Sequence, residues 1–543
     1  MKQIIFFLAT ILLFSNNFVF SQNNKVKFIN DKKNEKHTLK KNNLDRAYYF
    51  TDLSKSLDSV SQNLKLKGYF YNRYDSIITS KEQTSVHITF GKKIDSIRIF
   101  HRNKSVEVIE ISKLKNYLDN KNSILASEGK IFSKAELKNI TLEDNIISAS
   151  LVISDSKKRT IDKIVIKGYT EFPKTYLKHY LKLKTQSTFS PEKIETISQE
   201  INGLNFIEQQ KSPETLFSKD STIVYLYLKK VKNSSFDGLI NFSSSEREDL
   251  SINGNINFEL NNLINTGEQL HVNWNANGNE RQNLVLRTFI PYIFKSPISN
   301  NSSFEIYRQD SSFLSSKFNT ELTYDISPKM KAGLKFESLN SNNTLDSNNQ
   351  INSNTVDFSS SFVGPSFSYR TNTRNIFLKP KFSIQFNTLF GNRESENNNA
   401  NQIKTNLESN FNFNISQRSI IDIRNETSIL TSSSEILFNE LYRIGGINSI
   451  RGFDPQSIFS SQYSFFNIEY IYLTSQQKSY LYSITDIGIS EDITKKTNIL
   501  FGYGFGYAFK RSNTLINLSI TSNLSENLNK NRFNLSIIFK NYF

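Results

Sequence analysis

Short segments in which apolar and polar residues strictly alternate fill this chain from about residue 236 to Phe543. In one of them Phe318, Leu322, Tyr324 and Ile326 alternate with polar residues. Successive side chains of a β-strand point to opposite faces, so such a strand has one apolar and one polar face. After residue 21 no apolar run approaches the roughly 20 residues of a membrane-spanning helix, and the mean hydropathy is −0.45. These features exclude a helical membrane protein and favour a membrane β-barrel with a polar lumen.

The length of the alternating region predicts the number of strands. A membrane strand with its share of the connections takes roughly 19 residues. Residues 236–543 therefore predict a membrane all-β barrel of about 16 antiparallel strands. A soluble sandwich or propeller would need a dry core, whereas the polar faces here are rich in Asn and Ser. Two Asn-rich spans, 341–354 and 394–402, are expected to be surface loops.

Two segments near the carboxyl end are typical of barrel strands. Residues 499–509 place aromatic side chains on one face and glycines on the other, which suits a strand whose lumen side is crowded by another element. The last segment, 532–543, carries Phe539 and Phe543 on its apolar face. A terminal strand that ends in Phe resembles the sorting signal of outer-membrane barrels.

The first 21 residues have the parts of a secretory signal peptide. Lys2 precedes an apolar run from Ile4 to Phe14, and a cleavage site is expected near Ser21. The run is too short to span a bilayer. Because the chain has no cysteine, it forms no disulfides, no thiolate metal clusters and no lipid-anchored amino terminus.

Residues 22–232 differ in kind, because strand-like segments alternate there with helical periodicity. Residues 161–230 predict a β-α-α-β-β order. The expected elements are a strand over 161–169, helices over 174–183 and 191–204, and a closing strand over 222–230. This order resembles a POTRA domain, the periplasmic polypeptide-binding module that precedes some outer-membrane barrels. Two earlier units resemble it less completely, so the expected units are 22–92, 93–159 and 160–232, with two units the alternative count. The barrel is expected over 233–543.

One short stretch between the alternating segments is rich in glycine. It contains Gly445, Gly446, Ile450, Arg451, Gly452 and Phe453. In this setting it resembles the arginine loop of the BamA/TamA family of outer-membrane barrels, which folds back into the lumen and places an arginine there. Glycines suit the tight backbone turns of such a loop, and the aromatic residue suits its packing. Other stretches similar to the family are 236–238, 262–267, 280–282, 291–294 and 466–470.

The resemblance also implies a partner for the arginine. Residues 484–488 are similar to an aromatic-x-Asp-x-Gly strand motif of the family, with Ile484 in place of the aromatic residue and with Asp486 and Gly488 retained. In the family the loop arginine pairs with this aspartate inside the barrel, so Arg451 is expected to meet Asp486. A guanidinium and a carboxylate in a partly dry lumen can form a bidentate, charge-assisted contact.

The family resemblance implies a function in assembling other proteins. Family members insert client barrels into the outer membrane, and a weakly paired seam between the first and last strands could open to template an incoming strand. The POTRA sheets would receive client segments at an exposed edge. About three POTRA units make the chain more similar to TamA than to BamA. The implied partners are unfolded outer-membrane proteins, outer-membrane lipids and a periplasmic or inner-membrane protein. The implied location is the bacterial outer membrane, with the POTRA domains in the periplasm.

Two other classes of function stay open. A two-partner polypeptide secretion pore combines POTRA units, a similar barrel and the same loop motif. A structural surface barrel is a third interpretation, which is disfavoured because it would not need POTRA domains. A pore should conduct once Arg451 is displaced, whereas an assembly factor should speed the insertion of another barrel into liposomes.

No motif predicts an enzyme, a cofactor or a metal site. Of the five histidines only His271 lies in the barrel region, and nothing marks a nucleophile. The glycines near residue 504 lack the βαβ context of a dinucleotide site. We therefore expect no enzymatic activity, no cofactor and no metal.

Charge divides between the two halves of the chain. Residues 1–230 contain 39 Lys and Arg against 24 Asp and Glu, a net charge of +15, and residues 231–543 have a net charge of +1. The basic half fits attraction to anionic lipids or acidic partners. It equally fits lysines that only solvate helices and sheet edges. Nucleic acid is not an expected partner of an exported chain.

Overall fold

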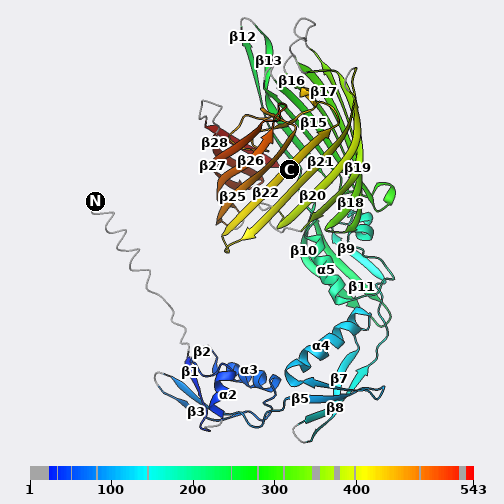
Figure 1. Cartoon of the computed structure of the whole chain (residues 1–543). Coiled ribbons are helices and arrows are strands. Elements are labelled where there is room, and N and C mark those ends of the chain that lie inside the picture. Colours follow the sequence, from blue (N-terminus) through cyan, green and yellow to red (C-terminus); the bar gives the residue numbers. More distant parts are fainter. Residues whose placement is uncertain are drawn as a thin grey trace, which may run out of the picture. The chain divides into compact units, whose positions relative to one another are not determined.

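The structure is a computed structural model that describes residues 24–32, 35–50, 52–80, 83–143, 146–245, 248–277, 281–309, 312–344, 355–371, 380–396, 399–475, 478–524 and 533–543. The expected signal peptide, residues 1–21, lies outside these ranges. The chain forms two compact units, Met1–Thr160 with Thr188–Pro191, and Ile161–Ser187 with Glu192–Phe543 (Figure 1). No helix within the described ranges is long and apolar enough to cross a membrane.

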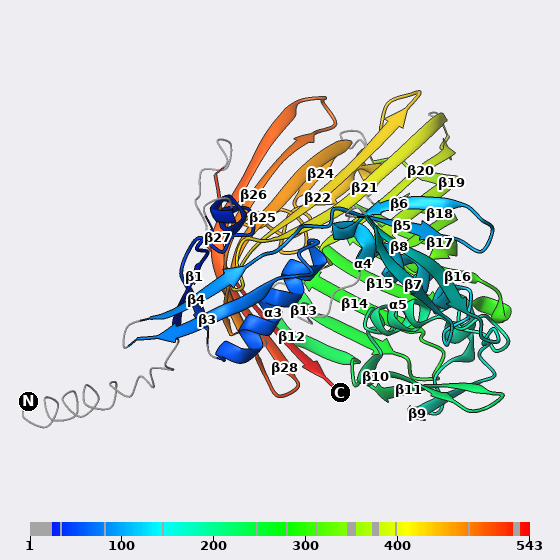
Figure 2. The ribbon, with the colours of Figure 1, turned by 90° about the horizontal axis from the view of Figure 1, so that it is seen from below.

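The first unit begins with a four-stranded sheet in the order β2-β1-β4-β3. Its strands are β1 (Asn24–Ile29), β2 (Tyr48–Phe50), β3 (Arg73–Thr79) and β4 (Thr84–Thr89), and its helices are α2 (Lys36–Lys41) and α3 (Leu53–Leu66). Leu57 and Leu64 of α3 share a core with Val26 and Val86 of the sheet. Figures 1 and 2 show α3 alongside this sheet. Asp52 caps α3, because its side chain accepts a hydrogen bond from the Lys55 amide.

A second four-stranded sheet completes the first unit, in the order β6-β5-β8-β7. Its elements are β5 (Ser96–Phe100), β6 (Val106–Glu110), α4 (Ile111–Ser127), β7 (Lys134–Glu143) and β8 (Ile146–Ser154). Ile97 and Ile99 of β5 share a core with Ile111 of α4 and Ala149 of β8. In a β-α-α-β-β order a helix would follow the first strand, but in this sheet β5 is followed by strand β6.

The second unit opens with a three-stranded sheet in the order β10-β11-β9. Its elements are β9 (Lys163–Gly168), the π-helix η2 (Tyr176–Tyr180), α5 (Pro191–Ile201), β10 (Ile207–Phe217) and β11 (Thr222–Lys230). The helix expected over 174–183 ends early, because Lys182 adopts a left-handed backbone with φ of 49°. Helix α5 begins at Pro191, directly after Ser190, as expected.

A closed antiparallel barrel of 16 strands fills the rest of the second unit, which confirms the predicted fold class. Its strands are β12 (Ser235–Ser245), β13 (Glu248–Asn261), β14 (Gln269–Asn277), β15 (Arg281–Ile290), β16 (Ile298–Gln309), β17 (Phe313–Ser327), β18 (Met330–Asn343), β19 (Phe358–Arg370), β20 (Phe382–Glu394), β21 (Ala400–Asn414), β22 (Ser419–Ser432), β25 (Gln462–Ser475), β26 (Ser479–Glu491), β27 (Thr497–Arg511), β28 (Thr514–Asn523) and β29 (Asn534–Tyr542). Figure 1 shows these strands tilted around the barrel.

The two expected surface loops are shorter than predicted. Residues 341–343 belong to β18, Glu394 belongs to β20, and residues 400–402 belong to β21. Ser341 pairs with Ser315, and Gln402 pairs with Ser432. Ser341 and Gln402 are buried on the inner side of these extensions, which suits polar side chains of a barrel lumen.

The barrel has the two faces that alternation predicts. Phe318, Leu322, Tyr324 and Ile326 of β17 are exposed on the outer face. Asp325, between two of them, is buried. Apolar side chains on the outside face lipid, and polar side chains line the lumen.

Candidate functional site

The candidate site is built by the long connection between β22 and β25. Residues 433–461, here called the lumen loop, contain the short helix η5 (Phe438–Glu440) and the strand pair β23 (Tyr442–Ile444) and β24 (Ile458–Ser460). All six residues that the sequence analysis singled out in the glycine-rich stretch lie in this loop. The other candidate feature is the seam where β12 meets β29.

The structure brings Arg451 and Asp486 together. The guanidinium makes a bidentate contact, with Nε 2.9 Å from Oδ2 and Nη2 2.6 Å from Oδ1. The backbone N–H of Arg451 donates to Oδ2 at 2.8 Å as well. Arg451 also forms an ion pair with Glu469 of β25. Asp486 is fully buried, so its charge is balanced by the arginine and not by water. We call Arg451, Asp486 and Glu469 the first anchor of the lumen loop.

Glycines let the backbone of the loop reach the barrel wall. Gly452 has φ of 92°, and a Cβ there would lie 2.3 Å from the Ser522 carbonyl oxygen. On β27, a Cβ at Gly502 would lie 2.0 Å from the carbonyl oxygen of Arg451. The crowding element expected beside the glycine face of residues 499–509 is therefore, at Gly502, the lumen loop itself.

The remaining expected residues pack around the first anchor. Ile450 and Phe453 are buried in a cluster with Tyr463, Phe465 and Leu500.

Three more glycines fit closely in the same region. Gly445 and Gly446 both have positive φ, and Gly488 faces Ile450, whose side chain would lie 2.9 Å from an added Cβ. Phe539 lies exposed on the outer face of β29, away from the lumen loop.

Sequence reasoning missed the amides that hold the loop backbone. Asn523 and Asn534 donate to the Gly452 carbonyl oxygen at 2.6 and 3.1 Å. Asn467 donates to the Ser449 carbonyl oxygen at 2.8 Å. Asn467 and Glu469 both lie in the family-like stretch 466–470, which was the one available signal for them.

A second group of buried polar residues holds the start of the lumen loop. Glu440 of η5 pairs with Arg393 of β20, and both side chains are almost completely buried. Gln402 of β21 donates to Glu440 at 2.5 Å. Asn439 donates to the Ser341 hydroxyl at 2.8 Å. We call Glu440, Arg393 and Gln402 the second anchor. The sequence contains no motif that indicates it.

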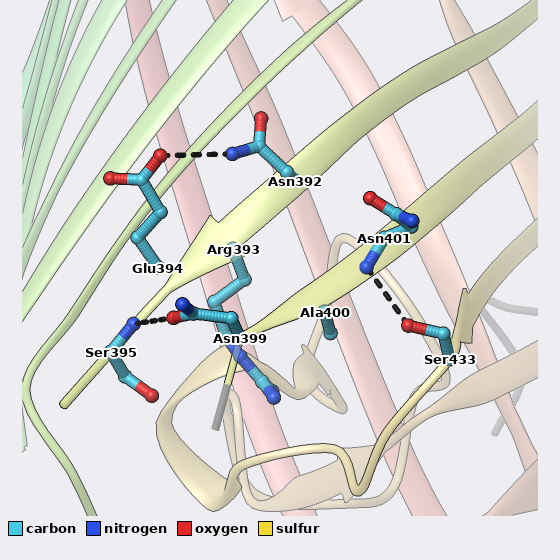
Figure 3. Close-up of a pocket in the computed structure, with 8 residues that line it drawn as sticks. All are labelled: Asn392, Arg393, Glu394, Ser395, Asn399, Ala400, Asn401 and Ser433. Carbon is cyan, nitrogen blue, oxygen red and sulfur yellow. Dashed lines mark hydrogen bonds between the residues drawn. The ribbon is translucent and has the colours of Figure 1, made fainter. Parts of the chain in front are cut away.

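Aromatic contacts support the second anchor. Arg443 lies over the Tyr307 ring of β16, 3.6 Å from the centroid. Phe438 stacks on Phe459 with ring centroids 4.5 Å apart. Arg393 also lines a hollow of about 600 Å³ at the end of the β20–β21 hairpin. Figure 3 shows the residues that line it. The backbone N–H of Asn401 donates a hydrogen bond to the hydroxyl of Ser433, at the start of the lumen loop.

The seam is the least paired junction of the barrel among the described residues. Two residue pairs join β12 to β29, Ser235 with Tyr542 and Phe236 with Asn541. Eight pairs join β28 to β29.

Three further contacts reinforce the same end of the seam. The Phe543 N–H donates to Ser234 at 2.9 Å. Lys540 bridges to Glu259 of β13 at 2.8 Å. The Phe543 ring stacks on Phe258 at 6.4 Å.

The three-stranded sheet unit is joined to the barrel through an aromatic contact. Tyr176 of η2 packs edge-on against Tyr292 with ring centroids 5.0 Å apart. The Tyr292 hydroxyl donates to Asp325 at 2.7 Å. Burial, with the nearby Asp325 carboxylate, raises the pKa of Tyr176 far above its ordinary value. Tyr176 therefore stays neutral in this joint.

The described residues offer no candidate metal centre. No group of three His, Asp or Glu side chains there has the geometry to hold a metal ion. His271 lies in the barrel wall and shares a hydrogen bond of 2.5 Å with Asn257.

Comparisons with known proteins agree with this architecture. Residues 262–537 match the Omp85 superfamily domain, and residues 159–229 match the POTRA family described as a surface antigen variable number repeat. No curated protein matches the chain significantly.

Two solved structures share the fold at low sequence identity. CdiB from Acinetobacter baumannii is 15% identical with a TM-score of 0.54, over 96% of this chain and 90% of that one. CdiB from Escherichia coli is 14% identical with a TM-score of 0.53, over 90% and 97%. BamA from Haemophilus ducreyi lacking POTRA domains 1–3 is 15% identical with a TM-score of 0.45, over 81% and 95%. The expected closeness to TamA stays a prediction. The Omp85 match spans half of the chain, so this protein belongs to the Omp85 superfamily, as an outer-membrane β-barrel of bacteria whose POTRA domains lie in the periplasm.

Proposed function

We propose that this protein assists the insertion of other β-barrel proteins into the outer membrane. The observation that carries the proposal is the seam, where two residue pairs join β12 to β29. Backbone N–H and C=O groups in lipid must find partners within protein. A strand edge that its neighbour leaves unpaired is therefore a favourable place for an incoming client strand to add.

The contacts at the seam cluster at one end. Ser235 and Phe236 are at the start of β12, and Asn541 and Tyr542 are at the end of β29. The Lys540–Glu259 bridge and the Phe543–Phe258 stack lie at this same periplasmic end. Toward the extracellular end, β12 continues to pair with β13 as far as Ser245, but not with β29. The periplasmic pairs are therefore the contacts that must separate before a client strand can add along the whole of β12.

The periplasmic sheets suit the reception of unfolded clients. Residues 22–92, 93–159 and 160–232 are proposed as three POTRA units, each with an edge strand to which an extended segment could add. The partners we propose are unfolded outer-membrane proteins, outer-membrane lipids and a periplasmic or inner-membrane protein. The basic charge of residues 1–230 favours acidic partners and anionic surfaces.

A polypeptide secretion pore is the competing function, and the lumen loop bears on it. Two buried ion-pair groups, Arg451 with Asp486 and Glu440 with Arg393, hold the loop inside the barrel. Secretion through the lumen would require both groups to separate. Insertion of a client at the seam would leave both in place, so assembly needs the smaller rearrangement.

A liposome assay separates the two functions. The purified full chain is reconstituted into phospholipid vesicles, an unfolded barrel protein is added, and its folding is followed by protease protection. An assembly factor speeds insertion relative to empty vesicles. Vesicles that hold an equal mass of an unrelated folded barrel control for bilayer defects. Insertion at the rate of those control vesicles, together with a large conductance, would instead identify a pore.

A further inference from the structure

Two consecutive periplasmic turns of the barrel have the same unusual construction. One is the connection 262–268 between β13 and β14, and the other is the connection 291–297 between β15 and β16. We call them the rim turns. Each binds the third POTRA sheet unit with one side and exposes large apolar side chains on the other.

The inner side of the first rim turn is fixed by polar contacts and close packing. Asn262 donates to the Tyr169 hydroxyl at 3.1 Å, and the Tyr169 hydroxyl donates to Asn265 at 2.7 Å. Gly267 lies against the Tyr176 ring, which would be 2.5 Å from an added Cβ.

The inner side of the second rim turn is fixed by stacked rings. Tyr292 contacts Tyr176 and stacks on His179 with ring centroids 5.3 Å apart. His179 is also 3.1 Å from the Lys295 carbonyl oxygen. Tyr292, Phe294 and Lys295 all have left-handed backbones, with φ of 52°, 52° and 59°. Non-glycine residues rarely adopt this conformation, so these packing contacts hold the turn in it.

The outer side of both turns is apolar and exposed. Phe294 is 98% exposed, Ile264 is 73% exposed and Leu263 is 56% exposed. The strands occupy the barrel wall, and the POTRA contacts occupy the inner side of the turns. Neither place can bury these three side chains. Water alone is a poor environment for three large apolar groups held on two neighbouring turns.

The outer side of the turns continues the lipid-facing surface of the barrel. Ile290, the last residue of β15, and Ile298, the first of β16, are both exposed on the outer face. Phe294 lies between them in the chain. The exposed Lys295 is next to it, and the Lys182 amine donates to the Ile326 carbonyl oxygen at the same rim. Apolar groups flanked by lysines match a phospholipid, because its acyl chains would contact the apolar groups and its anionic phosphate would contact the lysines.

We propose that the rim turns form a lipid-binding surface that inserts Leu263, Ile264 and Phe294 into the phospholipids of the periplasmic leaflet. Because the same turns hold Tyr169 and Tyr176 on their other side, the leaflet also fixes the orientation of the third POTRA unit against the barrel. This proposal does not depend on whether the protein assembles clients or secretes them.

The single tryptophan of the chain makes a direct test possible. A Trp274→Phe background removes the native signal, and Phe294→Trp then places one reporter on the second rim turn. Leu322→Trp on the exposed outer face of β17 is the membrane control, and Leu216→Trp on exposed β10 is the water control. Each full-length protein is reconstituted into vesicles of phosphatidylethanolamine and phosphatidylglycerol, with or without brominated acyl chains. Quenching by bromine and by aqueous iodide is compared.

We expect brominated lipid to quench the Phe294→Trp reporter severalfold more than the Leu216→Trp reporter, and iodide to show the reverse order. Quenching by iodide without quenching by bromine would overturn the proposal, because it would place the turn in water and not in the leaflet. Ile264→Trp repeats the test on the first rim turn, so a folding defect in one variant does not decide the outcome.

Discussion

At the scale of single residues, the first anchor concentrates charge where water is scarce. Asp486 accepts three hydrogen bonds from Arg451 and is fully buried. Losing one partner leaves an uncompensated charge, which costs about 3–5 kcal/mol at a buried site. The Glu469 pair reduces this cost for Asp486 variants, because Arg451 keeps one carboxylate partner.

We predict that Arg451→Ala and Asp486→Ala destabilise the protein through one shared interaction. A double-mutant cycle measured by denaturant unfolding should give a coupling energy of about 1 kcal/mol or more, because contacting charges are not additive. Asp486→Asn keeps the shape of the side chain and is the matched control for the loss of charge. Additive effects of the two alanine variants would mean that the residues do not interact.

Gly502 gives a prediction that removes no charge. An alanine there would place its Cβ 2.0 Å from the Arg451 carbonyl oxygen. Backbone must move, so Gly502→Ala should release the lumen loop and make it sensitive to protease. Gly238→Ala is the control, because its nearest contact would be 3.0 Å. Equal protease resistance of both variants would contradict the close approach.

At the scale of elements, the lumen loop is a plug with two separate attachments. The first anchor joins it to β25 and β26, and the second joins it to β20 and β21. Because the anchors share no residue, each can hold the loop when the other is lost.

We predict that channel conductance rises in two steps. Arg451→Ala alone and Glu440→Gln alone should leave the lumen mostly closed in planar bilayers, and the double variant should open it. Asp454→Asn is the control for a loop charge, because Asp454 is exposed and belongs to neither anchor. A fully open pore in the Arg451→Ala variant would show that the second anchor does not hold the loop.

The elements also show where sequence reasoning succeeds and fails. The glycine face of residues 499–509 indicated a neighbour in the lumen, because a missing Cβ leaves a local mark in the sequence. The Arg393–Glu440 pair left no such mark, because one partner lies on a strand and the other in the lumen loop, far apart in the chain. A single acidic residue also shows no periodicity. The early end of η2 depends on the positive φ of Lys182, which residue type does not predict.

At the scale of the whole molecule, periodicity was sufficient to predict the barrel of 16 strands. Side-chain alternation is a local property. The strand count follows from the length of the alternating region divided by the roughly 19 residues that one membrane strand and its share of the connections take. The seam was predicted only as a location. Its two residue pairs depend on the tilt and stagger of the whole barrel, which local pattern does not specify.

The seam yields the decisive prediction for the proposed function, because the native chain has no cysteine to interfere. Phe236 and Asn541 lie directly opposite each other across it, so Phe236→Cys with Asn541→Cys should form a disulfide. Leu518→Cys with Ile537→Cys is the matched control, because this pair joins the fully paired strands β28 and β29. Oxidation should reduce client insertion to the rate of empty vesicles for the seam pair alone, and a reductant should restore it. If the oxidised seam pair inserts clients as fast as the oxidised control pair, then opening between β12 and β29 is not the working step. The unpaired edges would then no longer favour an assembly factor over a secretion pore.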